Sequence, residues 1–336
     1  MIYDIEHITE YRFHRPVELG LHRLTFRPRD GHDMRVLATE LVVTPPEQRV
    51  DLVQDVYGNS LALVLPAAQA DRLKITCRFT VEHLGSSSFH DVAASETDLM
   101  PPPYSIAERL ALTPFLLPSF EDPELALHAW THPFAEAAQQ GGPRAVVARM
   151  CEAIRARFTY ASREAEGTQT PQQTLALGSG SCRDFATLMI DALRVLGIAA
   201  RFVSGYLYCP PLLAAAVQAN EPASTFAAVL AQPAETVVMA DATVAAEAAE
   251  PAPARVPLAP GPIVGGGFTH AWVQVFLPDC GWFPVDPTNN LIGGTDLIRL
   301  AVAREAAEVS PLSGMWWGEP EDFAGMSVTV QVTARD

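Results

Sequence analysis

The chain has 336 residues, of which 49% are hydrophobic, and its formal net charge is −16. This length is ample for two domains with buried cores. Such an acidic chain argues against nucleic acid and anionic membrane surfaces as partners, because both carry negative charge. The sequence shows neither an apolar run of the roughly 20 residues that span a bilayer nor the basic and apolar regions of a secretory signal. We therefore expect a cytoplasmic protein.

Residues 1–100 are rich in predicted strands. Apolar and polar side chains alternate clearly over residues 73–81, and residues 37–43 and 61–65 add two shorter segments of strand character. Several short strands separated by turn signals are typical of an antiparallel sandwich. We predict an N-terminal β-sandwich domain over residues 1–100.

Residues 101–300 form the second predicted unit, which begins at a run of three prolines. A helical stripe of apolar residues marks residues 144–158. Residues 210–262 are rich in Ala and Pro and weakly periodic, which fits either a passive surface insertion or a lid that covers the substrate. Residues 301–336 form a C-terminal segment, and we expect its final strand, residues 327–333, to return to the N-terminal sheet.

A loop of small residues, 178–181, leads directly into an amphipathic helix. Ser181 is a suitable N-cap, and Gly197 stands where a helix commonly ends. Cys182 then lies in the first turn, where unpaired N–H groups and the helix dipole favour an anion. Gly180 leaves room for a substrate to approach the sulfur. Residues spaced three and four apart make the buried stripe of this helix: Phe185, Leu188, Met189, Ala192, Leu193 and Leu196.

His270 opens a predicted strand, and a turn signal at residues 278–281 precedes a returning strand that ends at Asp286. A four-residue loop places Asp286 opposite Val273, on the wrong face of the hairpin. A three-residue loop, or a bulge near Pro284, places His270 and Asp286 on one face as diagonal neighbours. The sequence leaves these alternatives open.

Taken singly, the three residues Cys182, His270 and Asp286 fit a buried thiol, an ordinary strand residue and a turn residue. Together, a thiol, an imidazole and a carboxylate are the parts of a thiol acyl-transfer site. Two aromatic residues and one glycine are candidates for binding substrate or forming the walls of this site: Trp272, Trp282 and Gly180.

The remaining cysteines and histidines form no metal motif. The five cysteines, Cys77, Cys151, Cys182, Cys209 and Cys280, are scattered without a CxxC pair, as suits a reducing compartment. We expect Cys77 and Cys151 to be buried, because each lies on an apolar face. We expect surface positions for the histidines of the N-terminal region, His7, His14, His22 and His32.

Residues 180–185, 269–275 and 281–289, in this order, resemble the transglutaminase-like superfamily, and within it the bacterial branch associated with cysteine proteases. Residues 3–29 look like the N-terminal β domain of that branch. The resemblance covers most of the chain except about residues 209–265. It implies an α+β, papain-like core in which a nucleophile helix packs on an antiparallel sheet.

The resemblance also implies roles for the three residues: Cys182 as nucleophile, His270 as base and Asp286 as its orienting partner. Arg183 departs from the animal cross-linking enzymes, which carry an aromatic residue directly after the cysteine. A tryptophan-assisted oxyanion site is therefore not carried over to this chain.

The expected activity is that of a cysteine protease or amidase acting on a peptide or protein substrate. A transglutaminase that passes the acyl group to an amine is the alternative, and a non-catalytic binding scaffold is a third hypothesis. None of these requires a metal or an organic cofactor. The sequence carries no signal for the oligomeric state.

Overall fold

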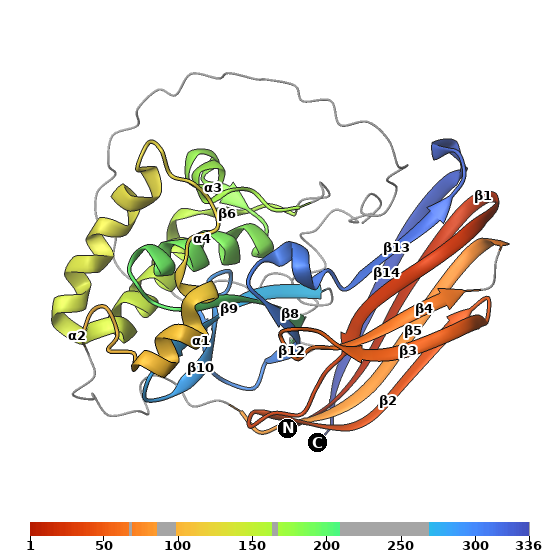
Figure 1. The fold of residues 1–336 in the computed structure, drawn as a ribbon, viewed down its shortest axis with the longest axis horizontal. Helices are drawn as coiled ribbons and strands as arrows, with labels where there is room; N and C mark the ends of the chain where they lie inside the picture. Colours follow the sequence, from red (N-terminus) through yellow and green to blue (C-terminus); the bar gives the residue numbers. More distant parts are fainter. Residues whose placement is uncertain (67–68, 86–98, 163–166, 209–268, 336) are drawn as a thin grey trace.

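The computed structural model describes residues 1–66, 69–85, 99–162, 167–208 and 269–335 (Figure 1). It combines a large antiparallel sheet with a second part in which helices pack on a smaller sheet. No helix in these ranges is long and apolar enough to cross a membrane. The predicted insertion at 210–262 and Cys209 lie outside the described residues.

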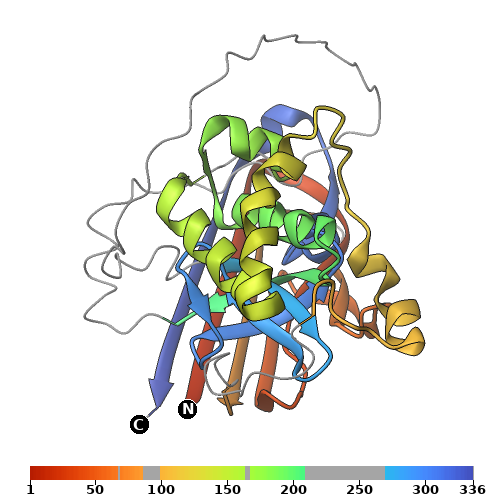
Figure 2. The same ribbon diagram turned by 90° about the vertical axis from the view of Figure 1, so that its left-hand side faces the viewer.

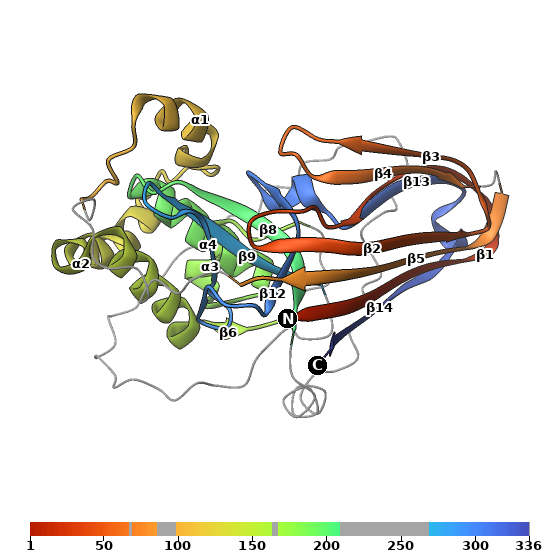
Figure 3. The same cartoon turned by 90° about the horizontal axis from the view of Figure 1, so that it is seen from below.

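The large sheet has seven strands in the order β2-β5-β1-β4-β3, with β13 and β14 also paired to β1. The first half of β1 pairs with β5 and β14, and the second half pairs with β4 and β13 (Figure 3). The predicted antiparallel character is confirmed, whereas a two-layered sandwich stays a prediction. The strands are β1 (Ile2–Arg27), β2 (Met34–Thr44), β3 (Glu47–Gln54), β4 (Ser60–Pro66), β5 (Gln69–His83), β13 (Leu312–Trp317) and β14 (Phe323–Arg335).

The final strand returns to the N-terminal sheet, as predicted. β14 runs antiparallel to β1, from Ile2 opposite Arg335 to Phe13 opposite Phe323. The alternation of Val328, Val330 and Val332 made this strand recognisable. The two ends of the chain are therefore held by one ladder of hydrogen bonds.

The smaller sheet has five strands in the order β11-β10-β9-β8-β12. Helices α2 and α4 pack on one face of it around a single apolar cluster (Figure 2). The strands are β8 (Ala200–Leu207), β9 (Thr269–Leu277), β10 (Gly281–Asp286), β11 (Leu291–Ile292) and β12 (Leu297–Ala303). The helices are α1 (Ile106–Leu116), α2 (Ala126–Arg157), α3 (Pro171–Leu177) and α4 (Cys182–Val195); two short parallel strands are β6 (Thr159–Tyr160) and β7 (Ser179–Gly180), and two 3-10 turns are η2 (Ala306–Val309) and η3 (Pro320–Asp322).

Helix α2 consists of two segments separated by a break. The backbone leaves the helical conformation at Gly141 and Gly142, directly before Pro143. The second segment confirms the helix predicted at 144–158. Its buried stripe belongs to the apolar cluster that α2 shares with α4 and the smaller sheet, and it consists of Val146, Val147, Met150, Cys151 and Ile154.

Two of the four N-terminal histidines are buried, contrary to the expected surface positions. His7 contacts the hydroxyl of Tyr206 on β8 at 2.7 Å and Thr9 at 3.1 Å, and burial lowers its pKa to about 3. His22 has the Gly20 carbonyl as its partner at 2.8 Å. Strand alternation turns these side chains inward, and short polar contacts satisfy them there. The His7–Tyr206 contact ties the large sheet to the smaller one.

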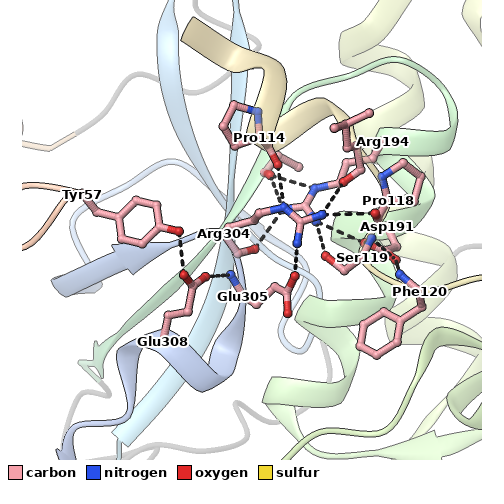
Figure 4. A network of polar contacts seen from close by, with 12 residues as sticks. Tyr57, Pro114, Pro118, Ser119, Phe120, Asp191, Arg194, Arg304, Glu305 and Glu308 are labelled. Atoms are coloured by element: carbon pink, nitrogen blue, oxygen red, sulfur yellow. Dashed lines mark hydrogen bonds and ion pairs between the residues drawn. The ribbon is translucent and has the colours of Figure 1, made fainter.

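A buried polar network fixes the end of α4 that lies away from Cys182 (Figure 4). Asp191 accepts hydrogen bonds from the backbone N–H groups of Ser119 and Phe120, at 3.0 Å each. Arg194 donates to the Ala200 carbonyl and, at 2.7 Å, to the Ser119 hydroxyl. A cavity of about 170 Å³ adjoins these side chains. The network holds α4 against the connection between α1 and α2.

Candidate active site

Cys182 is the first residue of α4, and its exposed fraction is only 8%. The preceding loop is fastened by the buried carboxylate of Asp184. This carboxylate accepts hydrogen bonds from the backbone N–H and the hydroxyl of Ser181, at 2.8 Å each, and from the Gln169 N–H at 2.7 Å. An acidic residue in the first turn is stabilised there by the unpaired N–H groups. Ser181 is the N-cap, as predicted, and Cys182 has a defined position.

The β9–β10 hairpin has a three-residue loop, 278–280. Gly281 pairs with Leu277, and the register continues without a shift to Val285 opposite Val273. The four-residue loop and the bulge near Pro284 are therefore wrong. Gly281 has φ of 70°, in the left-handed region that favours glycine, so this residue makes the bend while it begins the strand. Asp286 consequently lies on the same face as His270, as its diagonal neighbour.

His270 and Asp286 form a buried pair. Nε2 of His270 lies 2.9 Å from Oδ2 of Asp286, and both side chains have exposed fractions of 0%. The same Oδ2 accepts a hydrogen bond from Nδ2 of Asn289 at 2.8 Å, and Oδ1 accepts one from the Thr288 N–H at 2.9 Å. The other ring nitrogen, Nδ1 of His270, is buried and has no hydrogen-bond partner within the described chain.

The pair is held in its charged form. Burial opposes a charge on His270, but the charge of Asp286, its hydrogen bond to the ring and the nearby Cys182 outweigh burial and raise the pKa of His270 to about 10. Burial likewise opposes the charge of Asp286, but His270, Asn289 and Thr288 lower the pKa of this carboxyl group. An opposite charge at this distance in a dry environment has such an effect. The structure therefore brings an imidazolium, a carboxylate and a thiol together.

Trp272 lies beside this pair, as predicted. Its ring is stacked on that of His270, with centroids 6.1 Å apart, and the side chain is buried. Gly180 is buried next to α4, where an added Cβ would lie 2.9 Å from Cβ of Asp184. Packing against the helix therefore explains this glycine without a substrate.

Trp282 does not line the site, contrary to the prediction. It pairs with Phe276, six residues along β9 from His270, a separation of about 20 Å at the rise of a strand. Its ring packs edge-on against Phe115 of α1, and the guanidinium of Arg201 lies over it at 4.0 Å. Trp282 and His270 belong to one hairpin but lie at its opposite ends, so their common hairpin does not bring them into contact.

Three residues that contact Asp286 were not predicted as site residues: Thr288, Asn289 and Cys151. The first two belong to the Asp-Pro-Thr-Asn segment, and an Asx turn at Asp286 is visible in the sequence. Cys151 donates from Sγ to the backbone carbonyl of Asp286 at 3.3 Å. Its burial, like that of Cys77, confirms the prediction. Across the described ranges, no group of three or more His, Cys, Asp or Glu side chains is arranged to hold a metal.

The comparisons with known proteins agree with this architecture. Residues 129–287 match the family model of the transglutaminase-like superfamily, and residues 3–82 match that of the bacterial transglutaminase-like N-terminal region. An uncharacterized protein of Mycobacterium tuberculosis is 24% identical over 343 residues, which cover 98% of this chain and 92% of the relative. One of Mycobacterium leprae is 28% identical over 154 residues, which cover 46% of this chain and 37% of the relative.

Among solved structures, a Cytophaga hutchinsonii protein described as a "putative cysteine protease" is similar with a TM-score of 0.61 and 15% identity, covering 100% of this chain and 92% of that chain. At this identity the likeness concerns the fold. The two family models together span both parts of the molecule, the large sheet and the core with α2, α4 and the β9–β10 hairpin. The chain therefore belongs to the transglutaminase-like superfamily and carries the N-terminal region of its bacterial members.

Proposed function

We propose that the chain is a thiol acyl-transfer enzyme, a cysteine protease or amidase with Cys182, His270 and Asp286 as its catalytic triad. The observation that carries the proposal is the buried His270–Asp286 pair, whose free nitrogen Nδ1 remains available for the thiol of Cys182. An imidazolium partner and a helix N-terminus both favour the thiolate, which is the nucleophilic form.

In the first half of the reaction, the Cys182 thiolate attacks the carbonyl carbon of a peptide or amide bond. The negative charge moves to the carbonyl oxygen, which the backbone N–H of Cys182 helps to stabilise. The imidazolium of His270 gives its proton to the leaving nitrogen, the C–N bond breaks, and an amine leaves. The product is a thioester on Cys182 and a neutral imidazole.

In the second half, the imidazole of His270 takes a proton from a water molecule, and the oxygen attacks the thioester. The C–S bond breaks, a carboxylic acid leaves, and the thiolate–imidazolium pair is restored. Asp286 keeps the ring oriented and stabilises its positive charge throughout. Every step uses side chains of this chain, and none needs a metal or an organic cofactor.

A transglutaminase reaction differs only in the second half, where an amine replaces water. The family models favour this as the alternative function. Lys74 is the only lysine of the chain, so acceptor amines would come from another molecule. Scattered cysteines are typical of a reducing compartment, so the cytoplasm remains the expected location of the protein.

The test uses electrophilic peptides and mass spectrometry. A panel of peptide electrophiles is incubated with the full chain, with Cys182→Ala and with His270→Ala, and the labelled residue is mapped. We expect labelling at Cys182 in the wild type and its loss in Cys182→Ala. Unlabelled amide substrates then distinguish the acceptors, because hydrolysis yields a free acid and transamidation adds the mass of a supplied primary amine. A chain whose Cys182 stays inert while folded would be a binding scaffold instead.

A further inference from the structure

Asp286 is held from two sides. Asn289 donates from Nδ2 to the carboxylate oxygen that also contacts His270, at 2.8 Å. Cys151 donates from Sγ to the backbone carbonyl of the same residue, at 3.3 Å. Cys151 comes from α2 and Asn289 from the turn after β10, so the two contacts originate in different layers of the core.

The thiol of Cys151 is suited to be a permanent donor. Its side chain is fully buried, and burial, together with the charges of Asp286 and Glu152, raises its pKa well above the usual range. The group therefore stays protonated at neutral pH. Its neighbours on the buried stripe of α2 include Val147, Met150 and Ile154, which have no polar hydrogen to donate.

The two contacts restrain different motions of Asp286. The amide of Asn289 directs the carboxylate toward His270, whereas the thiol of Cys151 fixes the main chain at the end of β10. Of the side-chain hydrogen bonds that Asp286 receives in the described chain, only that of Cys151 comes from a helix. A displacement of about 1 Å in a supporting contact is enough to impair a catalytic group.

We propose that Asn289 and Cys151 are positioning residues that clamp Asp286 against His270. The clamp deepens the function proposed above and rests on it. Loss of either contact allows Asp286 to move away from Nε2 of His270, which weakens the imidazolium. Cys182 then reacts more slowly with electrophiles at neutral pH.

The experiment measures the rate of Cys182 alkylation by iodoacetamide from about pH 5 to about pH 10, by mass spectrometry of the Cys182 peptide in the full chain. The variants are Asn289→Ala, Cys151→Ala and Cys151→Val, which lack the donors, and Cys151→Ser, which keeps one. The matched controls are Cys77→Ala, which removes a buried thiol from the large sheet, and Asn290→Gly, which changes the adjacent exposed asparagine but keeps its left-handed conformation. Thermal unfolding is recorded for each variant.

We expect the pH of half-maximal alkylation to rise by on the order of half a unit in each variant that lacks a donor. Cys151→Ser, Cys77→Ala and Asn290→Gly should follow the wild type. Cys151→Val leaves no cavity and carries no polar hydrogen, so it separates the lost donor from a cavity if Cys151→Ala fails to fold. Profiles of Asn289→Ala and Cys151→Val that match the wild type would overturn the clamp. A shift in Cys151→Ser as large as that in Cys151→Val would also overturn it, since packing would then be the cause.

Failure of the clamp and failure of the proposed function give different results. If wild-type Cys182 reacts no faster than an ordinary thiol, the triad itself is refuted, whatever the variants do. If wild-type Cys182 is reactive and depends on His270, but the donor-free variants are unchanged, only the clamp is refuted.

Discussion

The replacement Asp286→Asn is the sharpest test of how the pair works. The amide has nearly the shape of the carboxylate but no charge, so packing around α2 and β10 should be preserved. In the wild type, the environment raises the pKa of His270 from 6.5 to about 10. At about 1.4 kcal/mol per unit, this shift corresponds to roughly 5 kcal/mol of stabilisation of the imidazolium. The charge of Asp286 and its hydrogen bond to His270 are the largest of the interactions that raise this pKa.

Without that charge, burial, which favours the neutral ring, is opposed only by the weaker influence of Cys182. We expect Asp286→Asn to lower turnover by up to about 10⁴-fold, as in triads where an amide enforces the wrong tautomer. The assay is hydrolysis of the best substrate of the peptide panel, measured as a function of pH, with circular dichroism and thermal unfolding as checks of the fold. The alkaline limb that reflects His270 near pH 10 should disappear. A folded Asp286→Asn protein with wild-type turnover and an unchanged pH profile would refute the argument.

Three further predictions concern reactivity and stability. Cys182 should be the fastest thiol toward iodoacetamide at neutral pH; Cys280 is half-buried and burial raises its pKa to about 11, so faster labelling of Cys280 would refute the assignment. The raised pKa of His270 contributes stability that is fully present below about pH 6.5 and is lost as the pH rises through about 10. The thermal midpoint of the wild type should therefore fall as the pH rises through this window, whereas the midpoint of His270→Gln should lack this pH dependence. Trp282→Ala should lower the thermal midpoint, because its contact with Phe115 is lost, yet it should leave the rate of Cys182 alkylation unchanged. A large change in that rate would show that Trp282 contributes to the site.

Local patterns in the sequence were sufficient for the elements that carry the site. The three- and four-residue spacing from Phe185 to Leu196 predicted α4, and strand alternation predicted β9 and β14, because apolar residues recur with a different period in a helix and in a strand. Strand β3 escaped prediction, since its side chains are mostly exposed and show no alternation. The first segment of α2 escaped as well, because Pro133 and a weak apolar stripe hide its helical period.

The hairpin shows where local reasoning stops. Its two strands were predicted, but the face of Asp286 depended on whether Gly281 belongs to the loop or to the strand. That choice rests on a single backbone angle, φ of 70° at Gly281, which the sequence permits without requiring. The placement of Trp282 beside the site failed for a related reason, because a shared hairpin says nothing about distance along its strands.

The site is the meeting point of two elements that are held independently. Helix α4 is fixed at its start by Asp184 and near its end by the network around Arg194, whereas His270 and Asp286 are fixed by the register of their hairpin. Both elements can be inferred from their own segments, although the register of the hairpin cannot. Their meeting depends on α2, whose Cys151 stands 135 residues before the carbonyl that it contacts, and no local pattern encodes such a contact. In the sequence, a cysteine within an apolar stripe is interpreted as a packing residue. Its hydrogen-bond partner is identified only in the folded structure. The clamp experiment therefore tests the part of the site that sequence reasoning is least able to reach.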